Sequence, residues 1–232
     1  MINLLFIYLI NIYGMIFIMF YDRKDAGKKL AAALKEYKDK DVLILAIPKG
    51  GIEVAIEVAK YLNADFSLAI VRKLPFPDEP EGGFGAIAED GSIYINSETS
   101  RYLDDETIKI IVDEQKNEIK RRISVLRNGK PLPELKDRTV ILIDDGIAAG
   151  SSMRAAIMLL RNNGTKKIVV ASPVAGEEII LKLKKLADKI VILEIPQFFR
   201  AVAQVYQNWY DVSDREALEL IKGFTNKENN EN

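Results

Sequence analysis

Residues 140–152 read VILIDDGIAAGSS, and this stretch decides how the rest of the chain is interpreted. Its first four residues are branched aliphatics, as in a strand that is buried on both faces of a parallel sheet. The strand ends at two adjacent carboxylates, Asp144 and Asp145, and small residues follow until an apolar helical pattern begins at Met153. The order of strand, loop and helix predicts a ligand site at the carboxyl edge of an α/β sheet.

The loop after this strand has the composition of an anion site. Gly146 and Gly150 let the backbone turn tightly and approach a ligand closely. The small residues around them allow several N–H groups and two hydroxyls to face one concavity at the start of the next helix, which suits a phosphate. The paired carboxylates upstream can accept hydrogen bonds from vicinal hydroxyls, so the whole segment describes a site for ribose 5-phosphate. It is not a Walker P-loop, because three residues rather than four separate the glycines and no lysine follows.

Strand-like and helix-like segments alternate on both sides of this loop. Apolar runs predict strands over 42–47, 66–71, 139–143, 167–171 and 190–193. Helical spacing predicts helices over 25–38 with Asp25 as N-cap, 52–62, 104–127 on the outside of the sheet, 153–162, 177–187 and 214–221. We therefore expect one doubly wound α/β domain, residues 20–224, built on a mostly parallel sheet.

Residues 72–96 interrupt this alternation. They contain three prolines and four glycines, with short strand-like pieces at 86–88 and 93–95. An excursion of this length inside a compact domain is either a disordered insert or a functional loop. Glu89 and Asp90 read as a hairpin turn with Gly91 more readily than as an acid–base pair.

The two ends of the chain differ from the domain between them. Residues 1–19 carry no charge and are strongly apolar, and a basic group follows that includes Arg23 and Lys24. Three readings stay open for this segment: an extension outside the native protein, an anchor whose basic flank faces the cytoplasm, or an element of the core. Residues 225–232 are rich in Asn and Glu and are expected to be disordered.

Composition excludes several classes of function. The chain of 232 residues has 33 Lys and Arg against 34 Asp and Glu, so no overall field attracts nucleic acid or an anionic membrane. There is no Cys and no His, which rules out disulfides, thiol nucleophiles, zinc fingers and the Ser-His-Asp triad. Any chemistry must use carboxylates, Lys and Arg, backbone N–H groups, tyrosines or Mg²⁺. Absence of Cys is compatible with a cytoplasmic location, which we expect.

Residues 140–152 closely resemble the ribose-phosphate signature of type I phosphoribosyltransferases. The segment 48–51 is similar to the pyrophosphate loop of that family, with Lys49 where arginine is common. Arg72 and Lys73, followed by the Pro- and Gly-rich excursion, resemble the strand end that contacts pyrophosphate and the mobile catalytic loop after it. Segments 20–27, 71–73, 85–91 and 201–206 are similar to a branch of the family whose reaction is not characterised, so the resemblance covers residues 20 to about 221.

The resemblance implies a reaction at the anomeric carbon of phosphoribosyl pyrophosphate. Pyrophosphate would leave and a nitrogen acceptor, such as a nucleobase, would be captured with inversion. Asp144 and Asp145 would hold the 2- and 3-hydroxyls and, through water, a Mg²⁺ ion, and with Lys73 they are the expected catalytic residues. The expected substrate contacts are Lys49, Gly50, Gly51 and Arg72 for pyrophosphate, and Gly146, Ile147, Ala148, Ala149, Gly150, Ser151 and Ser152 for the ribose phosphate.

The resemblance also implies a small hood over the site. Phe198, Phe199 and Trp209 are candidates for a platform on which the acceptor stacks, although such aromatics more often belong to a core or an interface. Ala148 stands where enzymes for 6-oxopurines carry an aspartate, which argues against hypoxanthine or guanine. Relatives commonly form homodimers, so we expect one here, and we expect no nucleic-acid partner and no membrane association apart from residues 1–19. The alternative function is a regulator that binds a phosphoribosyl ligand without catalysis.

Overall fold

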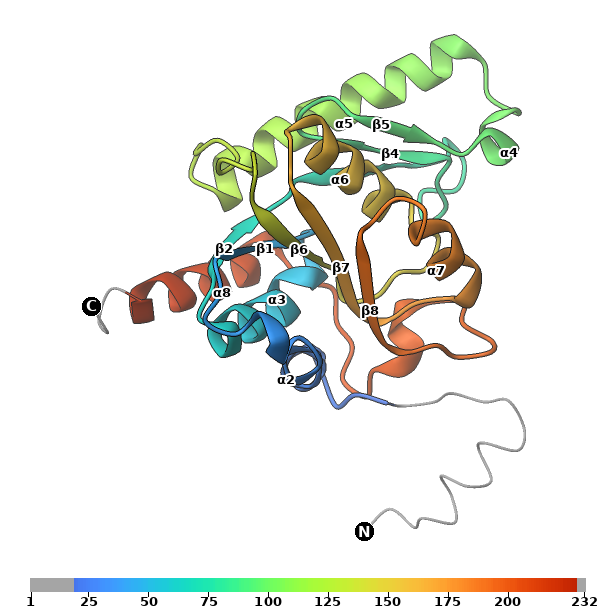
Figure 1. Ribbon diagram of the computed structural model, residues 1–232. Helices are drawn as coiled ribbons and strands as arrows, with labels where there is room; N and C mark the ends of the chain where they lie inside the picture. Colours follow the sequence, from blue (N-terminus) through green and yellow to red (C-terminus); the bar gives the residue numbers. More distant parts are fainter. Residues whose placement is uncertain (1–18, 229–232) are drawn as a thin grey trace.

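The computed structural model describes residues 19–228, and Figure 1 traces the whole chain. Its strands are β1 (Val42–Ala46), β2 (Asp65–Leu68), β3 (Val71–Leu74), β4 (Gly85–Ala88), β5 (Ile93–Ile95), β6 (Thr139–Ile143), β7 (Lys167–Val174) and β8 (Lys189–Glu194). Its helices are α2 (Arg23–Ala33), η1 (Lys35–Tyr37), α3 (Gly50–Leu62), α4 (Ser97–Ser100), α5 (Asp105–Leu126), α6 (Ser151–Asn162), α7 (Glu177–Leu183), η2 (Val202–Val205) and α8 (Asp214–Glu228). The hypotheses for residues 1–18 lie outside the described residues, and no helix of residues 19–228 is both long and apolar enough to cross a bilayer.

A five-stranded sheet in the order β2-β1-β6-β7-β8 forms the centre of the molecule, and every pair in it is parallel. The continuous aliphatic runs explain this arrangement, because strands of a parallel sheet are covered on both faces. Figure 1 shows α2 and α3 on one face of the sheet, and α6 with the β3–β5 strands on the other. The predicted α/β fold with a mostly parallel, doubly wound sheet is confirmed.

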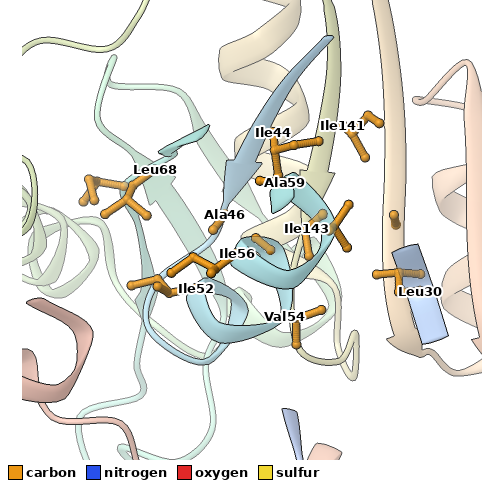
Figure 2. Packing of buried hydrophobic residues seen from close by; sticks show 14 of the residues in the cluster. Leu30, Ile44, Ala46, Ile52, Val54, Ile56, Ala59, Leu68, Ile141 and Ile143 are labelled. Carbon is orange, nitrogen blue, oxygen red and sulfur yellow. The ribbon is translucent and has the colours of Figure 1, made fainter. Parts of the chain in front are cut away.

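Alternate side chains of the central strands supply the two cores. Ile44 and Ala46 of β1 belong to the core beneath α2 and α3, whereas Leu43 and Leu45 belong to the core beneath α6. Figure 2 shows the first of these cores, with Ile52 and Ile56 of α3 beside the strand residues. Because both faces are apolar, polar groups are confined to the strand ends, which is where a ligand site can form.

The chain leaves the first sheet at a break that the sequence does not predict. The expected strand 66–71 is two strands in the structure: β2 ends at Leu68, and β3 begins at Val71 in a separate antiparallel sheet of order β3-β4-β5. At the break, the carboxylate of Glu89 accepts the Ile70 N–H at 2.9 Å, and Arg127 donates to the Leu68 carbonyl at 3.2 Å. Glu89 and Arg127 also form an ion pair, with side chains only 7% and 6% exposed. These side chains satisfy the backbone groups that leave the strand ladder, which is why the strand can break here.

Several predicted element boundaries need correction. Helix α2 begins at Arg23 with Asp22, not Asp25, as its N-cap, because the Asp22 carboxylate accepts the Asp25 N–H at 2.7 Å. The helix predicted over 104–127 packs on β3 and β4, not on the outside of the central sheet. Helix α8 continues to Glu228, so the expected disorder from residue 225 is wrong as far as that residue.

The remaining corrections concern the lengths of three elements. Helix α6 begins at Ser151, two residues inside the predicted loop, and β7 runs to Val174 where the prediction ended at residue 171. Helix α7 ends at Leu183, before the predicted end at residue 187.

Gly27 allows α2 and α3 to pack closely, and it generates a first prediction. A Cβ at Gly27 would lie 2.8 Å from the Val54 carbonyl oxygen and 2.9 Å from the Glu57 Cβ, and backbone cannot move aside easily. We expect Gly27→Ala to lower the free energy of unfolding in urea by about 1–3 kcal/mol. In α8 nothing lies within 4 Å of a Cβ at Gly223, so Gly223→Ala should raise the free energy of unfolding by about 0.5–1 kcal/mol. Equal effects of the two substitutions would contradict this packing.

Candidate functional site

The loop between β6 and α6 opens into a cavity at the carboxyl edge of the central sheet. The cavity has a volume of about 300 Å³ and is lined by Lys73, Glu81, Gly82, Gly83, Asp144, Gly146–Met153 and Val202. Ala148 and Ala149 are exposed, and Gly150, Ser151 and Ser152 are half-buried. All seven residues predicted to cradle the phosphate therefore line one cavity, and Met153 joins them.

The backbone of this loop leaves its N–H groups available to a ligand. Gly150 has a φ of +73°, in the left-handed region that favours glycine, and it precedes the first residue of α6. The N–H of Arg154 donates to the Gly150 carbonyl at 3.0 Å, so the amides at the start of α6 precede the hydrogen-bond ladder of the helix. Such a helix start is an anion-binding group.

The middle of the loop is anchored to the next strand. The Ile147 N–H donates to the Val174 carbonyl at 2.9 Å, and its side chain is only 2% exposed. Gly146 is packed so closely that a Cβ there would lie 2.4 Å from a methyl carbon of Val202 in η2. Both the side chain and the N–H of Ile147 are therefore occupied within the protein, and the loop is fixed where Gly146 packs beneath η2.

The two adjacent carboxylates have different surroundings. Asp144 is half-buried and lines the cavity, and its Oδ1 accepts the Asp145 N–H at 2.9 Å. Asp145 is 8% exposed and does not appear among the cavity residues. Its Oδ2 accepts a hydrogen bond from Arg23 Nε at 2.7 Å, and its carbonyl accepts the Tyr206 hydroxyl at 2.7 Å. Only Asp144 is placed to meet a ligand in the cavity; the diol contact predicted for Asp145 stays a prediction.

Burial governs the electrostatics of this pair. Burial, followed by the charge of Asp145, raises the pKa of Asp144 well above its ordinary value of 3.8. Burial also raises the pKa of Asp145, and the charge and hydrogen bond of Arg23 oppose that shift. A cation bound beside Asp144 would stabilise its ionised form. Among the described residues no three acidic side chains, Cys or His gather as a metal site, so a Mg²⁺ ion there would need ligand oxygens as well.

The turn after β1 lies directly against the two carboxylates. A Cβ at Gly50 would be 1.8 Å from Asp145 Oδ2, and one at Gly51 would be 2.9 Å from the Ile143 carbonyl oxygen. Both positions therefore require glycine, and the amides at the start of α3 lie beside the acidic pair. The peptide between Pro48 and Lys49 is cis. The Lys49 ammonium is 3.5 Å from Asp214 Oδ1 at the start of α8.

The sequence predicts Arg72 and Lys73 at a strand end, but in the structure they lie in the middle of β3. Adjacent strand residues point to opposite faces of a sheet, so the two side chains separate. Lys73 lines the cavity and donates to the Glu81 carbonyl at 2.6 Å. Arg72 instead donates to Gln115 of α5 at 3.0 Å. The structure brings Lys73 to the loop of residues 146–152, which we name the phosphate loop after its predicted ligand, but does not bring Arg72 there, and a ligand contact of Arg72 stays a prediction.

The three predicted hood aromatics lie in three different environments. Phe198 is 71% exposed. Phe199 lines a second cavity of about 420 Å³, together with Ala148, Gly176, Glu177, Glu178, Ile179, Ile195, Pro196 and Gln197. Trp209 lies over the guanidinium of Arg23, 4.0 Å from its carbon to the ring centroid. Of the three, only Phe199 lies in a cavity that adjoins the phosphate loop, through the shared residue Ala148.

Arg23 is the functional-site residue that sequence reasoning misses. By position it groups with the basic residues that follow the apolar segment, yet its side chain is only 3% exposed and contacts Asp145. A signal is present in the helical spacing, because Arg23 lies on the same stripe of α2 as Ala26, Gly27, Leu30 and Ala31, all of them buried. An arginine on an apolar stripe needs a buried partner, and Asp145 provides it.

Comparisons with known proteins agree with this geometry. Residues 20–208 match the family model of the phosphoribosyl transferase domain. The chain is 38% identical over 205 residues to a Mycobacterium tuberculosis protein provisionally named a phosphoribosyl transferase, covering 88% of this chain and 46% of that protein. It therefore spans about half the length of this relative. It is also 22% identical over 202 residues to the amidophosphoribosyltransferase of Escherichia coli, covering 83% of this chain and 34% of that protein.

A solved structure supports the same assignment. The crystal structure of TT1426 from Thermus thermophilus superposes with a TM-score of 0.73 at 34% identity, covering 88% of this chain and 98% of that one.

The raised pKa of Asp144 gives a prediction for stability. This carboxyl is harder to ionise in the folded protein than in the unfolded chain, so its ionisation lowers the free energy of unfolding. The full loss is present at any pH above the raised pKa of the folded state. That cost disappears as the pH falls below 3.8, where both states are protonated. We expect Asp144→Asn to raise the thermal midpoint by a few degrees at pH 8, since about 1 kcal/mol shifts it by roughly 2–4 °C in a chain of this size.

The gain of Asp144→Asn should shrink steadily as the pH is lowered toward 4 in the same calorimetric series. Asp113, exposed on α5 and 3.0 Å from Lys116, serves as the control, because Asp113→Asn should change the midpoint little at any pH. A pH-independent difference for Asp144→Asn would refute the raised pKa.

Proposed function

Because the chain belongs to the phosphoribosyltransferase family, we propose that it binds phosphoribosyl pyrophosphate with Mg²⁺ and transfers ribose 5-phosphate to a nitrogen acceptor, releasing pyrophosphate. The observation that carries this proposal is the 300 Å³ cavity, whose lining contains both the start of α6 and Asp144. A terminal phosphate accepts hydrogen bonds, whereas a diol donates them to a carboxylate. One sugar phosphate can therefore pair with both the amides of the loop and the carboxylate of Asp144.

The second glycine turn supports a site for the pyrophosphate. A Cβ at Gly50 would lie 1.8 Å from Asp145 Oδ2, and one at Gly51 would lie 3.2 Å from Asp144 Oδ1. The start of α3, an anion-binding group, therefore lies against the acidic pair, although neither glycine lines the 300 Å³ cavity. Lys73 approaches from β3 and adds a positive charge beside the phosphate loop. By analogy with oxyanion donors, loss of one such contact should lower the rate by roughly 10²–10³-fold.

The chain's own residues bind, orient and shield the substrate in this mechanism. The amides of residues 148–152 and the hydroxyls of Ser151 and Ser152 hold the 5-phosphate, and Asp144 orients the diol and supports positive charge on the ribose ring. A bond forms between the acceptor nitrogen and the anomeric carbon as the bond from that carbon to pyrophosphate oxygen breaks. Asp144, together with ligand oxygens, would hold Mg²⁺, and the bound ion would supply positive charge beside the pyrophosphate.

The segment between β3 and β4 can exclude water from this reaction. Gly82 and Gly83 line the same cavity as the phosphate loop, and the Lys73 ammonium donates to the Glu81 carbonyl in the same segment. A covering segment limits hydrolysis, which competes with transfer to the acceptor.

The 420 Å³ cavity beside Ala148 is the proposed acceptor site. Its lining includes two carboxylates, one side-chain amide and the ring of Phe199, and it includes neither Lys nor Arg. A carboxylated acceptor would enter this cavity without a cation to pair with it, which is costly. We therefore expect a neutral or amino-substituted heterocycle rather than an acidic one.

The first test is calorimetry of phosphoribosyl pyrophosphate binding with and without Mg²⁺. We expect binding that requires Mg²⁺, and Asp144→Asn should weaken it by roughly tenfold to a hundredfold, since hydrogen bonds to charged groups contribute about 1.5–3 kcal/mol. Asp113→Asn, a matched change on the exposed face of α5, should leave the affinity unchanged. Equal affinities for wild type and Asp144→Asn would refute the role given to Asp144.

The second test is release of pyrophosphate in the presence of a panel of acceptors. Neutral and amino-substituted bases should be consumed at least tenfold faster than orotate, nicotinate or anthranilate, which carry carboxylates. Preference for an acidic acceptor would contradict the assignment of the 420 Å³ cavity. Tight binding with no release for any acceptor would instead favour the regulator that binds the ligand without catalysis.

A further inference from the structure

Arg23 is an unusual residue for the first turn of a surface helix. Its side chain is 3% exposed, and its Nε donates to Asp145 Oδ2 at 2.7 Å. One terminal nitrogen donates to the Tyr210 carbonyl at 2.9 Å, and the guanidinium lies 4.0 Å from the ring centroid of Trp209 and 5.3 Å from that of Tyr210. Removing such a charge from water is costly, and a buried ion pair is weak evidence for stability by itself.

Asp145 is constrained on several sides at once. Arg23 occupies one side of its carboxylate, and the backbone of Gly50 lies so close on another that no Cβ would fit between them. The Tyr206 hydroxyl holds its carbonyl at 2.7 Å. Asp145 is missing from the lining of the 300 Å³ cavity, although its neighbours Asp144 and Gly146 both line it. Its carboxylate is therefore committed to Arg23.

The orientation of Asp144 depends on this arrangement. Asp144 Oδ1 accepts the N–H of Asp145, so the backbone that Arg23 and Tyr206 hold in place also holds the carboxylate that faces the cavity. A chain of contacts thus leads from Arg23 to Asp145 and then to Asp144.

The segment that covers Arg23 is fixed to the first described residues of the chain. The N–H groups of Gln207 and Asn208 donate to the carbonyls of Phe20 and Tyr21, each at 2.9 Å. Trp209 follows directly and lies over Arg23. The ring that the sequence places in the acceptor platform is therefore part of the enclosure around the guanidinium.

We propose that Arg23 is a positioning residue of the site: it fixes Asp145, and through Asp145 it aims Asp144 at the ribose diol, while Trp209 covers the guanidinium of Arg23. The inference rests on the proposed function, because it assigns a role in binding phosphoribosyl pyrophosphate. The proposal gives the two aspartates different roles: Asp144 contacts the ligand, and Asp145 connects Asp144 to Arg23.

The test is a double-mutant cycle of Arg23→Gln and Asp145→Asn, with calorimetric affinity for phosphoribosyl pyrophosphate and Mg²⁺ as the readout. Each single variant should weaken binding by roughly tenfold to a hundredfold, because each leaves a buried polar partner unmatched. The double variant has two amides that can pair with each other. Its affinity should lie within about threefold of that of the more weakly binding single variant. Effects that multiply, or an unchanged affinity for Arg23→Gln, would overturn the proposal.

A matched arginine control separates positioning from general stability. Arg138 pairs with Asp65 at 2.8 Å and with Asp41 at 3.1 Å, at the amino ends of the strands and thus at the opposite edge of the sheet. Arg138→Gln should leave the affinity within twofold of wild type, even where urea unfolding shows that it is less stable. A loss of affinity that followed unfolding free energy in both variants would show that Arg23 is only structural.

Two further variants keep the test decisive where Arg23→Gln does not fold. Arg23→Lys retains the charge but carries its donors on a single nitrogen, so it lacks the fork with which Arg23 reaches Asp145 and Tyr210 from two nitrogens. It should therefore bind more tightly than Arg23→Gln and more weakly than wild type. Trp209→Leu should weaken binding by roughly two- to thirtyfold. Tyr102, which lies over Arg101 at 4.7 Å and is 76% exposed, is the matched ring, and Tyr102→Leu should have no effect. No effect of Trp209→Leu would refute the enclosure.

The outcomes for the two proposals are distinct. If the wild-type protein does not bind phosphoribosyl pyrophosphate, the proposed function is wrong and the role of Arg23 falls with it. If the wild type binds and the Arg23 variants bind equally well, only the positioning role is wrong.

Discussion

The register between β1 and β6 is the constraint on which the site depends. Ala46 pairs with Ile143, and the Ile47 N–H donates to the Ile143 carbonyl at 2.8 Å, so both strands end at the same level of the sheet. The turns that follow must then occupy one small region, and only the absence of side chains at Gly50 and Gly51 leaves space for the acidic pair. Because the starts of α3 and α6 both arrive there, two helix N-termini lie beside the half-buried carboxylate of Asp144. The chemistry of the site follows from this shared edge.

Two buried ion pairs occur where the backbone leaves regular structure. Glu89 and Arg127 satisfy the groups released between β2 and β3, and Arg23 and Asp145 pair at the end of β6. A buried pair contributes little net stability because desolvation opposes its attraction, yet loss of one partner is severe. In this protein one of the two pairs positions the hairpin that carries Lys73, and the other holds the loop that carries Asp144.

The fold class and the position of residues 146–152 at a cavity on the edge of the sheet could be predicted from the sequence, because both depend on local patterns. The aliphatic runs of β1 and β6 and the glycines of residues 146–150 act within a few residues of their own position. The errors arise where distant residues decide. The strand at 66–71 breaks because Glu89 and Arg127 take over its hydrogen bonds, and Arg23 is buried because Asp145, far along the chain, is its partner. The residue type of Trp209 suggests an acceptor platform, whereas its position over Arg23 depends on the pairing of residues 207–208 with 20–21. Helical spacing can identify Arg23, but not its partner.

The contact between Gly146 and Val202 links two segments that the chain order keeps apart. The methyl groups of Val202 occupy the volume that a side chain at position 146 would need, and Val174 closes the space from β7. Position 146 could therefore accept alanine only where position 202 has a smaller side chain. Where η2 does not lie over the loop, packing no longer requires glycine at position 146. Residues 146 and 202 should therefore covary among related sequences. A relative with a larger residue than glycine at position 146 should have either a smaller residue at position 202 or an η2 that does not cover the loop.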